Sequence, residues 1–256
     1  MNKLIFLFPL LFMVLSTEAH SQERHLSVGG GFLTGSQVDE GYSPLLFSGA
    51  QGSFNLTYTK LDGAKENIWM LGYASGQTQN RFGRSLESTS VSLLALTLYQ
   101  VDQESRFRWG WANSNQFNSR TPGGFQNYTG RSDYFTAFGP AMKYELPFRL
   151  LNQEFSFQTL SHLQLIGFYI PSGYVSSLPK GFGYDQDGFA ASVYNSAFLF
   201  HPGSAVNLGL IPTLQWGLSD NSSLGLTYSY DYTSLQNVHP SKRSRGNYLL
   251  SLTMKL

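Results

Sequence analysis

Few side chains in this 256-residue chain stand where acid–base or nucleophilic chemistry would need them. His162 lies inside a stretch of alternating polar and apolar residues, and Ser161 directly precedes it. A serine hydrolase needs a Ser nucleophile, a His base and an orienting polar group within hydrogen-bond reach. Successive side chains of a strand point to opposite faces, so Ser161 and His162 cannot form this pair. The pattern therefore argues against a nucleophilic site here.

Further polar residues that could belong to a protease-like site fall in or beside long connections. They are Asp133, Asp185, Asp187, Asp231 and His239. Connections carry polar residues for solubility alone, so this grouping has little weight. The "DQDG" stretch at 185–188 lacks the third acidic residue and the closing Glu of a calcium loop. The chain has no cysteine. We expect a non-enzymatic protein with no metal and no cofactor, and we keep a rim hydrolase of lipid or protein as an alternative.

The elements that would position these residues are strands, because apolar and polar residues alternate with period two. In "SSLGLTYSYDYT" (222–233), Leu224, Leu226 and Tyr228 oppose Gly225 and Thr227. We expect strands over 25–34, 50–60, 66–76, 88–101, 106–114, 133–145, 153–169, 205–218, 222–233 and 246–256. Their length exceeds that of ordinary globular strands and suits tilted strands that cross a membrane.

The connections between these strands alternate between short and long, and this favours a transmembrane antiparallel up-and-down β-barrel. Short turns such as "DNS" (220–222) lie on one side, and long loops such as 170–204 lie on the other. An even count of about ten strands places both chain ends on the short-turn side. Residues 189–203 are expected to be part of the long loop, with a short helix on the rim. If they form a strand, the count becomes twelve.

The first 21 residues are typical of a secretory signal peptide, with Lys3 followed by the apolar run "LIFLFPLLFMVL". Twelve apolar residues interrupted by Pro9 are too few to span a bilayer as a helix, which needs roughly 20. We expect residues 1–21 to be the signal and residues 22–256 to be a single barrel domain.

The last strand, 246–256, has apolar residues on one face and ends on one of them. These residues are Tyr248, Leu250, Leu252, Met254 and Leu256. Such a strand needs a neighbour on each side, and pairing with 25–34 would close the barrel. Here the chain resembles Gram-negative outer-membrane β-barrel proteins. The resemblance implies the outer membrane as location, and a C-terminal strand that the barrel-assembly machinery reads. Leu256 replaces the usual terminal aromatic residue.

The inward face of the expected barrel carries a cluster of polar and charged residues. They are Arg106, Arg108, Lys143, Glu145, Glu154, His162 and Asp231. A ten-stranded barrel is narrow, so side chains should fill most of its interior. We expect paired charges that offset each other's desolvation. A narrow path for a small solute is the first alternative.

The expected outer loops carry cations and aromatic residues that could contact lipopolysaccharide phosphates or a surface partner. They are Arg81, Arg84, Lys242, Arg243, Arg245, Tyr174 and Tyr184. The formal net charge of +1 gives no field that would attract nucleic acid. We therefore expect outer-membrane lipid, lipopolysaccharide and a surface ligand as partners.

Overall fold

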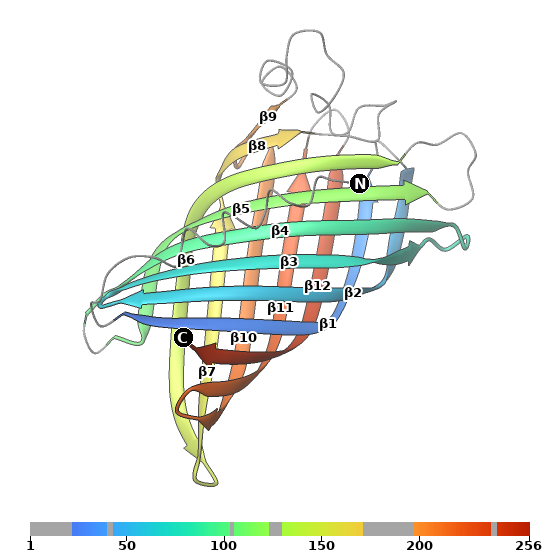
Figure 1. Ribbon diagram of the computed structural model, residues 1–256. Coiled ribbons are helices and arrows are strands. Elements are labelled where there is room, and N and C mark those ends of the chain that lie inside the picture. Colours follow the sequence, from blue (N-terminus) through green and yellow to red (C-terminus); the bar gives the residue numbers. More distant parts are fainter. Residues whose placement is uncertain (1–21, 40–42, 103–104, 123–129, 171–196, 237–239) are drawn as a thin grey trace, which may run out of the picture.

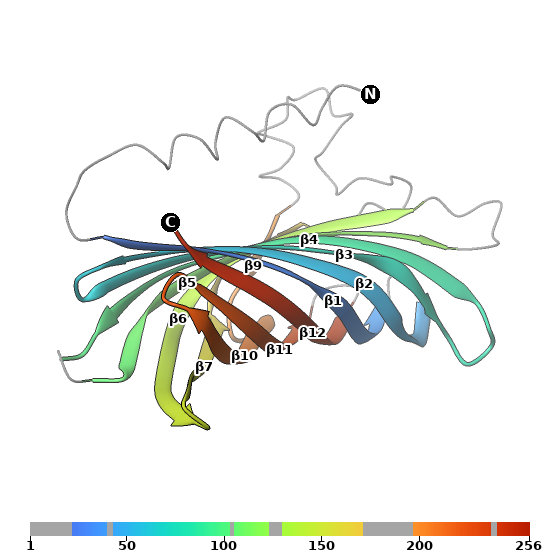
Figure 2. The ribbon, with the colours of Figure 1, turned by 60° about the horizontal axis from the view of Figure 1, so that its bottom comes forward.

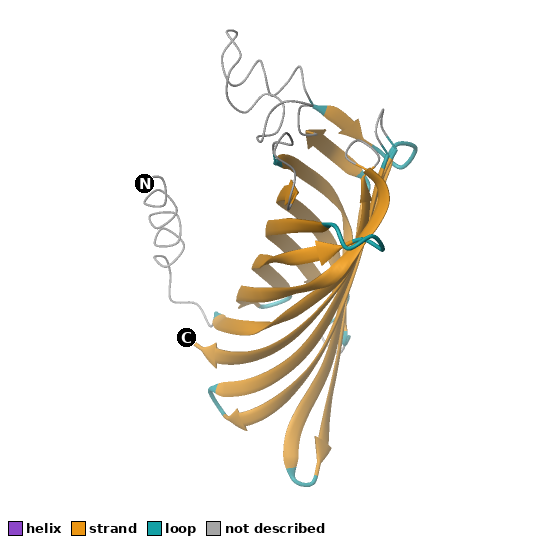
Figure 3. Ribbon diagram, turned by 90° about the vertical axis from the view of Figure 1, so that its right-hand side faces the viewer, coloured by secondary structure: helices purple, strands orange, loops and turns teal. Residues whose placement is uncertain are grey.

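The computed structural model describes residues 22–39, 43–102, 105–122, 130–170, 197–236 and 240–256 (Figure 1). Across these residues the chain forms strands and the short connections between them (Figure 3). No helix in these ranges is long and apolar enough to cross a membrane. The expected signal, residues 1–21, lies outside them and stays a prediction.

Ten antiparallel strands form one closed wall, as the alternation predicts. They are β1 (Glu23–Asp39), β2 (Ser43–Asp62), β3 (Lys65–Gln79), β4 (Ser85–Gln100), β5 (Phe107–Pro122), β6 (Arg131–Leu150), β7 (Gln153–Gln164), β10 (Ala205–Ser219), β11 (Ser222–Leu235) and β12 (Ser241–Lys255). Each pairs with the next, β7 pairs with β10, and β12 pairs with β1. The structure confirms the barrel fold.

Two short strands extend this wall at one end of the barrel (Figure 1). β8 (Ile166–Ile170) continues β7 along β6 after a break at Leu165, and β9 (Phe198–Phe200) pairs with β8. The described part of 189–203 is thus a strand followed by a turn, and the helix predicted for this segment is not found there. The rest of that segment lies outside the described residues. The wall keeps ten strands because β9 prolongs the line of β10.

The seam between the first and last strands is long and regular. β1 pairs with β12 from His25 opposite Lys255 to Asp39 opposite Ser241. The backbone N–H of Leu256 donates to the carbonyl of Arg24 at 2.9 Å. Figure 2 shows β12 lying between β1 and β11. The last strand therefore has a partner on both edges, as predicted.

Pairing around the barrel is staggered, and this sets the strand tilt. If we start at Gly30 of β1 and step to the paired residue on each neighbouring strand, from β2 through β5, we arrive at Tyr134 of β6. If we step the other way, through β12, β11, β10 and β7, we arrive at Leu146 of the same strand. The offset from 134 to 146 tilts the strands, by roughly 35–45° in barrels of this kind.

The turns at the end that carries the chain ends are short, as expected. Leu151 and Asn152 join β6 to β7 with positive φ angles of 52° and 62°, the conformation of a tight hairpin. At the other end the strands run further than predicted. The expected long loop between the first two strands shrinks to residues 40–42, since β1 reaches Asp39 and β2 starts at Ser43.

Candidate functional site: the barrel lumen

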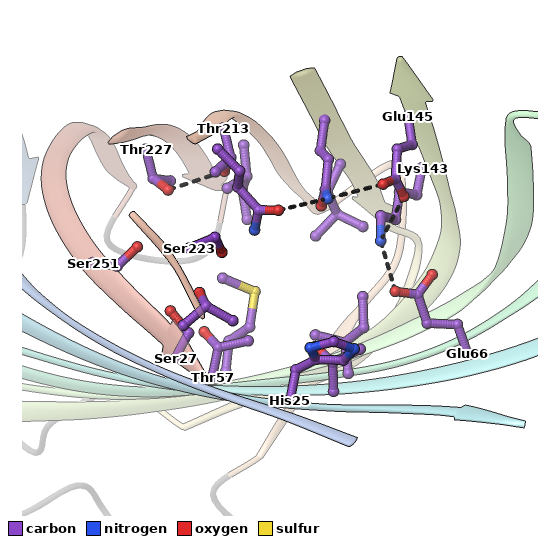
Figure 4. A pocket seen from close by; sticks show the side chains of 18 of the residues that line it. His25, Ser27, Thr57, Glu66, Lys143, Glu145, Thr213, Ser223, Thr227 and Ser251 are labelled. Atoms are coloured by element: carbon purple, nitrogen blue, oxygen red, sulfur yellow. Dashed lines mark hydrogen bonds and ion pairs between the residues drawn. The ribbon is translucent and has the colours of Figure 1, made fainter. Parts of the chain in front are cut away.

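The lumen holds a chamber of about 610 Å³ at the short-turn end (Figure 4). Nine of the ten wall strands line it, β4 being the exception among the strands that the structure describes. Exposed side chains of Glu23 and Arg106 stand among its lining residues, so solvent reaches the chamber from that end. Two smaller cavities, of about 130 and 30 Å³, follow toward the long-loop end.

Ion pairs around Glu66 form one wall of the chamber. Glu66 is 3% exposed, and its Oε2 accepts a hydrogen bond from Arg108 Nη1 at 2.9 Å. Its Oε1 accepts from Lys143 Nζ at 2.6 Å. Lys143 also lies 3.7 Å from Glu145, whose Oε1 accepts from Gln158 Nε2 at 3.3 Å. Glu66 is therefore the shared acceptor of two cations on different strands.

The sequence prediction placed Arg108, Lys143 and Glu145 in the lumen, and the structure brings them together. It did not include Glu66, because "ENIWMLGY" is apolar on both faces around it and leaves its phase open. Glu66, Ile68 and Met70 lie on the same face of β3, and all three line the chamber. Glu154 does not join this cluster: it pairs with Arg149 at 2.6 Å, and both side chains are exposed beyond the lumen.

The opposite wall of the chamber carries hydroxyl side chains from β1, β2, β10, β11 and β12 (Figure 4). They are Ser27, Thr57, Thr59, Thr213, Ser223, Thr227, Ser251 and Thr253. Thr213 and Thr227 bond to each other at 3.0 Å, and Thr57 donates to Asn55 at 2.7 Å. The chamber thus has a charged wall and a hydroxyl wall.

A partial apolar layer narrows the lumen between the chamber and the cavity of about 130 Å³, whose linings share Asn55, Met70, Ile211, Thr227 and Leu249. The buried cluster consists of Ile68, Leu96, Leu98, Ala112, Ala141 and Leu160, with Met70, Leu94 and Ile211 packed against it. The sequence led us to expect a cluster of polar and charged residues on the inward face, and it did not predict this layer. The apolar layer explains why β4 reads as apolar on both faces, since Leu94, Leu96 and Leu98 point inward.

Two arginines cross the lumen beyond the apolar layer. Arg243 and Arg245 of β12 each donate from Nη2 to Gln116 Oε1 of β5, at 2.9 and 3.0 Å. β12 and β5 lie five strands apart in a ten-stranded wall, so these bonds run from one side of the barrel to the other. Arg120 pairs with Asp133 beside them. We call Arg243, Arg245 and Gln116 the transverse bridge.

This bridge corrects the prediction that Arg243 and Arg245 are outer-loop residues that contact lipopolysaccharide. Both lie within β12, opposite Thr233 and Asp231 of β11, and their side chains point into the barrel. The error arises because β12 begins at Ser241, whereas "SKRSRG" reads as a polar loop. Lys242 does point outward and is exposed.

His162 and Asp231 line the middle cavity of about 130 Å³. Among the described residues, the side chain that hydrogen bonds to His162 is Gln164, from Nε2 to Nδ1 at 3.2 Å. Asp231 accepts from Asn207 Nδ2 at 3.2 Å. His162 is 8% exposed, and no serine of the described chain hydrogen bonds to it. The geometry here is that of a buried polar network.

The remaining residues of the predicted outer-loop set occupy the long-loop end. Arg81 stacks over the ring of Phe82 at 4.7 Å, and both are exposed, as is Arg84. Tyr174 and Tyr184 lie outside the described residues. Arg106 lines the chamber at the opposite end of the barrel.

The outer surface of the barrel is apolar, and this indicates the medium that surrounds it. Every wall strand exposes large apolar side chains on the face opposite the lumen, and this set includes Phe32, Phe54, Tyr73, Val91, Trp109, Met142, Phe157, Leu214, Leu226 and Leu250. Tyr248, Leu252, Met254 and Leu256 belong to it as well. A closed barrel with a continuous apolar exterior and a charged interior is the structure of a β-protein that spans a lipid bilayer. The chain is an outer-membrane β-barrel protein.

Comparisons with known proteins give distant likenesses to outer-membrane proteins. No family model and no curated protein sequence matches the chain. Among solved structures, the outer membrane protease OmpT from Escherichia coli is 11% identical, with a TM-score of 0.46, and the match covers 94% of this chain and 100% of that one. Neisserial surface protein A is 10% identical, with a TM-score of 0.39 and coverage of 93% and 100%. Ail, the attachment invasion locus protein of Yersinia pestis, is 11% identical, with a TM-score of 0.37 and coverage of 91% and 99%. Likenesses at this level assign no role.

Proposed function

We propose that this barrel is a non-enzymatic envelope protein with a closed lumen, whose outer rim binds lipopolysaccharide or a surface partner. The observation that carries the proposal is the transverse bridge. Arg243 and Arg245 meet Gln116 in the interior of a narrow barrel, and the apolar layer lies beneath them. The bridge spans the lumen and the apolar layer narrows it, so we do not expect free diffusion of solutes through the barrel.

The outer rim supports a binding role through its exposed cations. Arg81, Arg84 and Lys242 project near or beyond the end of the apolar exterior. Cations at that height can pair with the phosphates of lipopolysaccharide by charge-assisted hydrogen bonds. The proposal includes export through residues 1–21 and insertion by the barrel-assembly machinery, which would read the outward apolar residues of β12.

Planar-bilayer recording tests the closed lumen. We expect no steady unitary conductance from the wild-type barrel. Replacing both Arg243 and Arg245 by Ser should produce openings, because the bridge is lost and two large side chains leave the lumen. Lys242→Ser, on the outward face beside Arg243, should leave the barrel closed. Steady conductance of the wild type would reject this proposal and favour transport of a small solute.

Binding of the barrel to immobilised lipopolysaccharide tests the outer rim. The triple variant Arg81→Ser, Arg84→Ser and Lys242→Ser should bind several-fold more weakly, since each cation supplies an exposed contact of modest strength. Arg149→Ser removes a cation from the opposite end and serves as the control. A loss in Arg149→Ser about one third as large, in free energy, as that of the triple variant would mean that binding follows net charge and not the outer rim.

The chamber favours a second candidate function, passage of a small solute along a narrow path. It provides about 610 Å³ of polar space open to the short-turn end. This function would require the bridge to move. The same recordings separate the two candidates.

A further inference from the structure

The charged wall of the chamber has more hydrogen-bond donors than acceptors. All three carboxylates that line the chamber are occupied: Glu66 accepts from Arg108 and Lys143, and Glu145 accepts from Gln158 beside Lys143. Glu23, at the open end, accepts from Lys255 at 2.9 Å. The guanidinium of Arg108 has five N–H donors, and its contact with Glu66 uses one nitrogen. Its Nε is buried and has no partner among the described residues. A buried donor without a partner is costly, and a bound acceptor would remove that cost.

Arg106 adds a second guanidinium to the same wall. It lines the chamber two residues before Arg108, with an exposed side chain and no side-chain partner in the described part of the chain. Two guanidinium groups whose N–H donors remain available form a site for a carboxylate or a phosphate, which they can bind through two parallel hydrogen bonds. A cationic ligand would find all three carboxylates already engaged.

The opposite wall suits the uncharged part of such a ligand. Ser27, Thr59, Ser223 and Thr253 line the chamber, and none of these hydroxyls has a hydrogen-bond partner in the described chain. A hydroxyl both donates and accepts, so this wall matches a body rich in hydroxyl groups. No Phe, Tyr or Trp is among the lining residues, and His25 supplies the one aromatic ring there in the described chain. The chamber volume of about 610 Å³ lies within the range of small-molecule sites, roughly 300–1,000 Å³.

We infer that this chamber binds a small polyhydroxy anion that enters from the periplasmic end. Its carboxylate or phosphate contacts Arg106 and Arg108, and its hydroxyl groups face the Ser and Thr wall. This inference goes beyond the proposed function, because binding in the chamber does not depend on whether the transverse bridge closes the lumen. Steady conductance would overturn the closed lumen and leave the chamber site standing.

Isothermal titration calorimetry on the refolded barrel in detergent tests the site with defined probes. Gluconate and glucose 6-phosphate carry the anion, and glucose is the neutral control. We expect the anions to bind at least about tenfold more tightly than glucose, since charge-assisted hydrogen bonds are the stronger kind. Arg106→Gln should remove most of that difference. Arg149→Gln removes an exposed cation at the same end, outside the chamber, and should leave it unchanged.

Cysteine protection locates the bound probe without relying on a change in stability. The chain has no cysteine, so a single introduced thiol gives an unambiguous signal. Thr253→Cys lies in the chamber, and gluconate should slow its reaction with a maleimide, whereas glucose should not. Asp220→Cys lies in the exposed β10–β11 turn and should react at the same rate with or without gluconate. Anion binding no tighter than glucose, binding unaffected by Arg106→Gln, or absence of protection at residue 253 would each overturn the inference.

Discussion

At the scale of single residues, Glu66 is the buried carboxylate that two cations share in the wall of the chamber. It is almost fully buried and is the acceptor for both Arg108 and Lys143, which come from different strands. Removing one partner of a buried ion pair leaves the other charge uncompensated, and this costs more than the pair itself contributes. The carboxylate therefore holds β3, β5 and β6 together at the chamber wall.

Replacing Glu66 by Gln should destabilise the barrel by about 3 kcal/mol, because two partly buried cations lose their shared counter-charge. Urea unfolding of the refolded protein in detergent measures the loss. Glu154→Gln is the matched control: its pair with Arg149 is exposed on both sides, so the change should cost less than about 1 kcal/mol. Equal costs would show that solvent in the chamber screens Glu66 as fully as it screens Glu154.

The residue scale also shows what the sequence could predict about the site. The alternation phase gave the inward direction of Arg108, Lys143 and Glu145 correctly, since phase depends only on knowing the strand. It could not show that Glu154 lies past the end of the lumen, because phase carries no information on depth. It misassigned Arg243 and Arg245 because their strand begins earlier than its apolar residues do.

At the scale of elements, the seam between β1 and β12 depends on close backbone approach. A Cβ at Gly31 would lie 1.8 Å from the backbone oxygen of Tyr248, a contact that only strand separation can relieve. On the outer face of the same seam, Phe32 stacks on Tyr248 with ring centroids 5.0 Å apart. The strands are therefore held close at this point by both backbone and side chains.

Gly31→Ala should weaken barrel closure, because the added methyl group pushes β12 away from β1 and stretches their hydrogen bonds. The expected cost is about 1–3 kcal/mol, the range for overpacking. Gly30→Ala is the control on the adjacent position, where the nearest atom to the Cβ would be 4.0 Å away. Samples of each variant are heated to increasing temperatures and run on a gel. The temperature at which the band of the folded barrel disappears measures the stability of that variant. If the two variants lose this band at the same temperature, close approach at Gly31 does not limit closure.

Element existence was predictable from sequence, and element ends were not. Most wall strands carry the period-two pattern in their membrane-embedded part, where one face must be apolar, and β3 and β4 are in part apolar on both faces. At the long-loop end both faces are polar, as in "TGSQV" (34–38), so the pattern vanishes although the pairing continues. The strand at 198–200 was missed because three residues are too short to display a period.

At the scale of the whole molecule, the barrel reverses the arrangement of a soluble β-protein. Its outer face is apolar on every strand, and its interior holds ion pairs, hydroxyls and a thin apolar layer. Closure follows from this arrangement, because in lipid an unpaired strand edge has no water to satisfy its backbone groups. The stagger from Tyr134 to Leu146 of β6 completes the closure with tilted strands.

A charged substitution at Leu226 tests directly whether the apolar outer face contacts lipid. Leu226 lies on the outer face of β11, is 59% exposed, and pairs with Leu214 and Leu250, which are exposed on the same face. Leu226→Arg should cost about 2–4 kcal/mol, as for a cation placed near the bilayer midplane. Thr34→Arg places the same side chain on the same outer face beyond the apolar residues of β1, where the cost should be about 0–1 kcal/mol. Urea unfolding in lipid vesicles, with folding checked by the gel shift, measures both. If the two variants are equally stable, the apolar exterior does not face hydrocarbon, and the barrel's orientation in the membrane must be assigned anew.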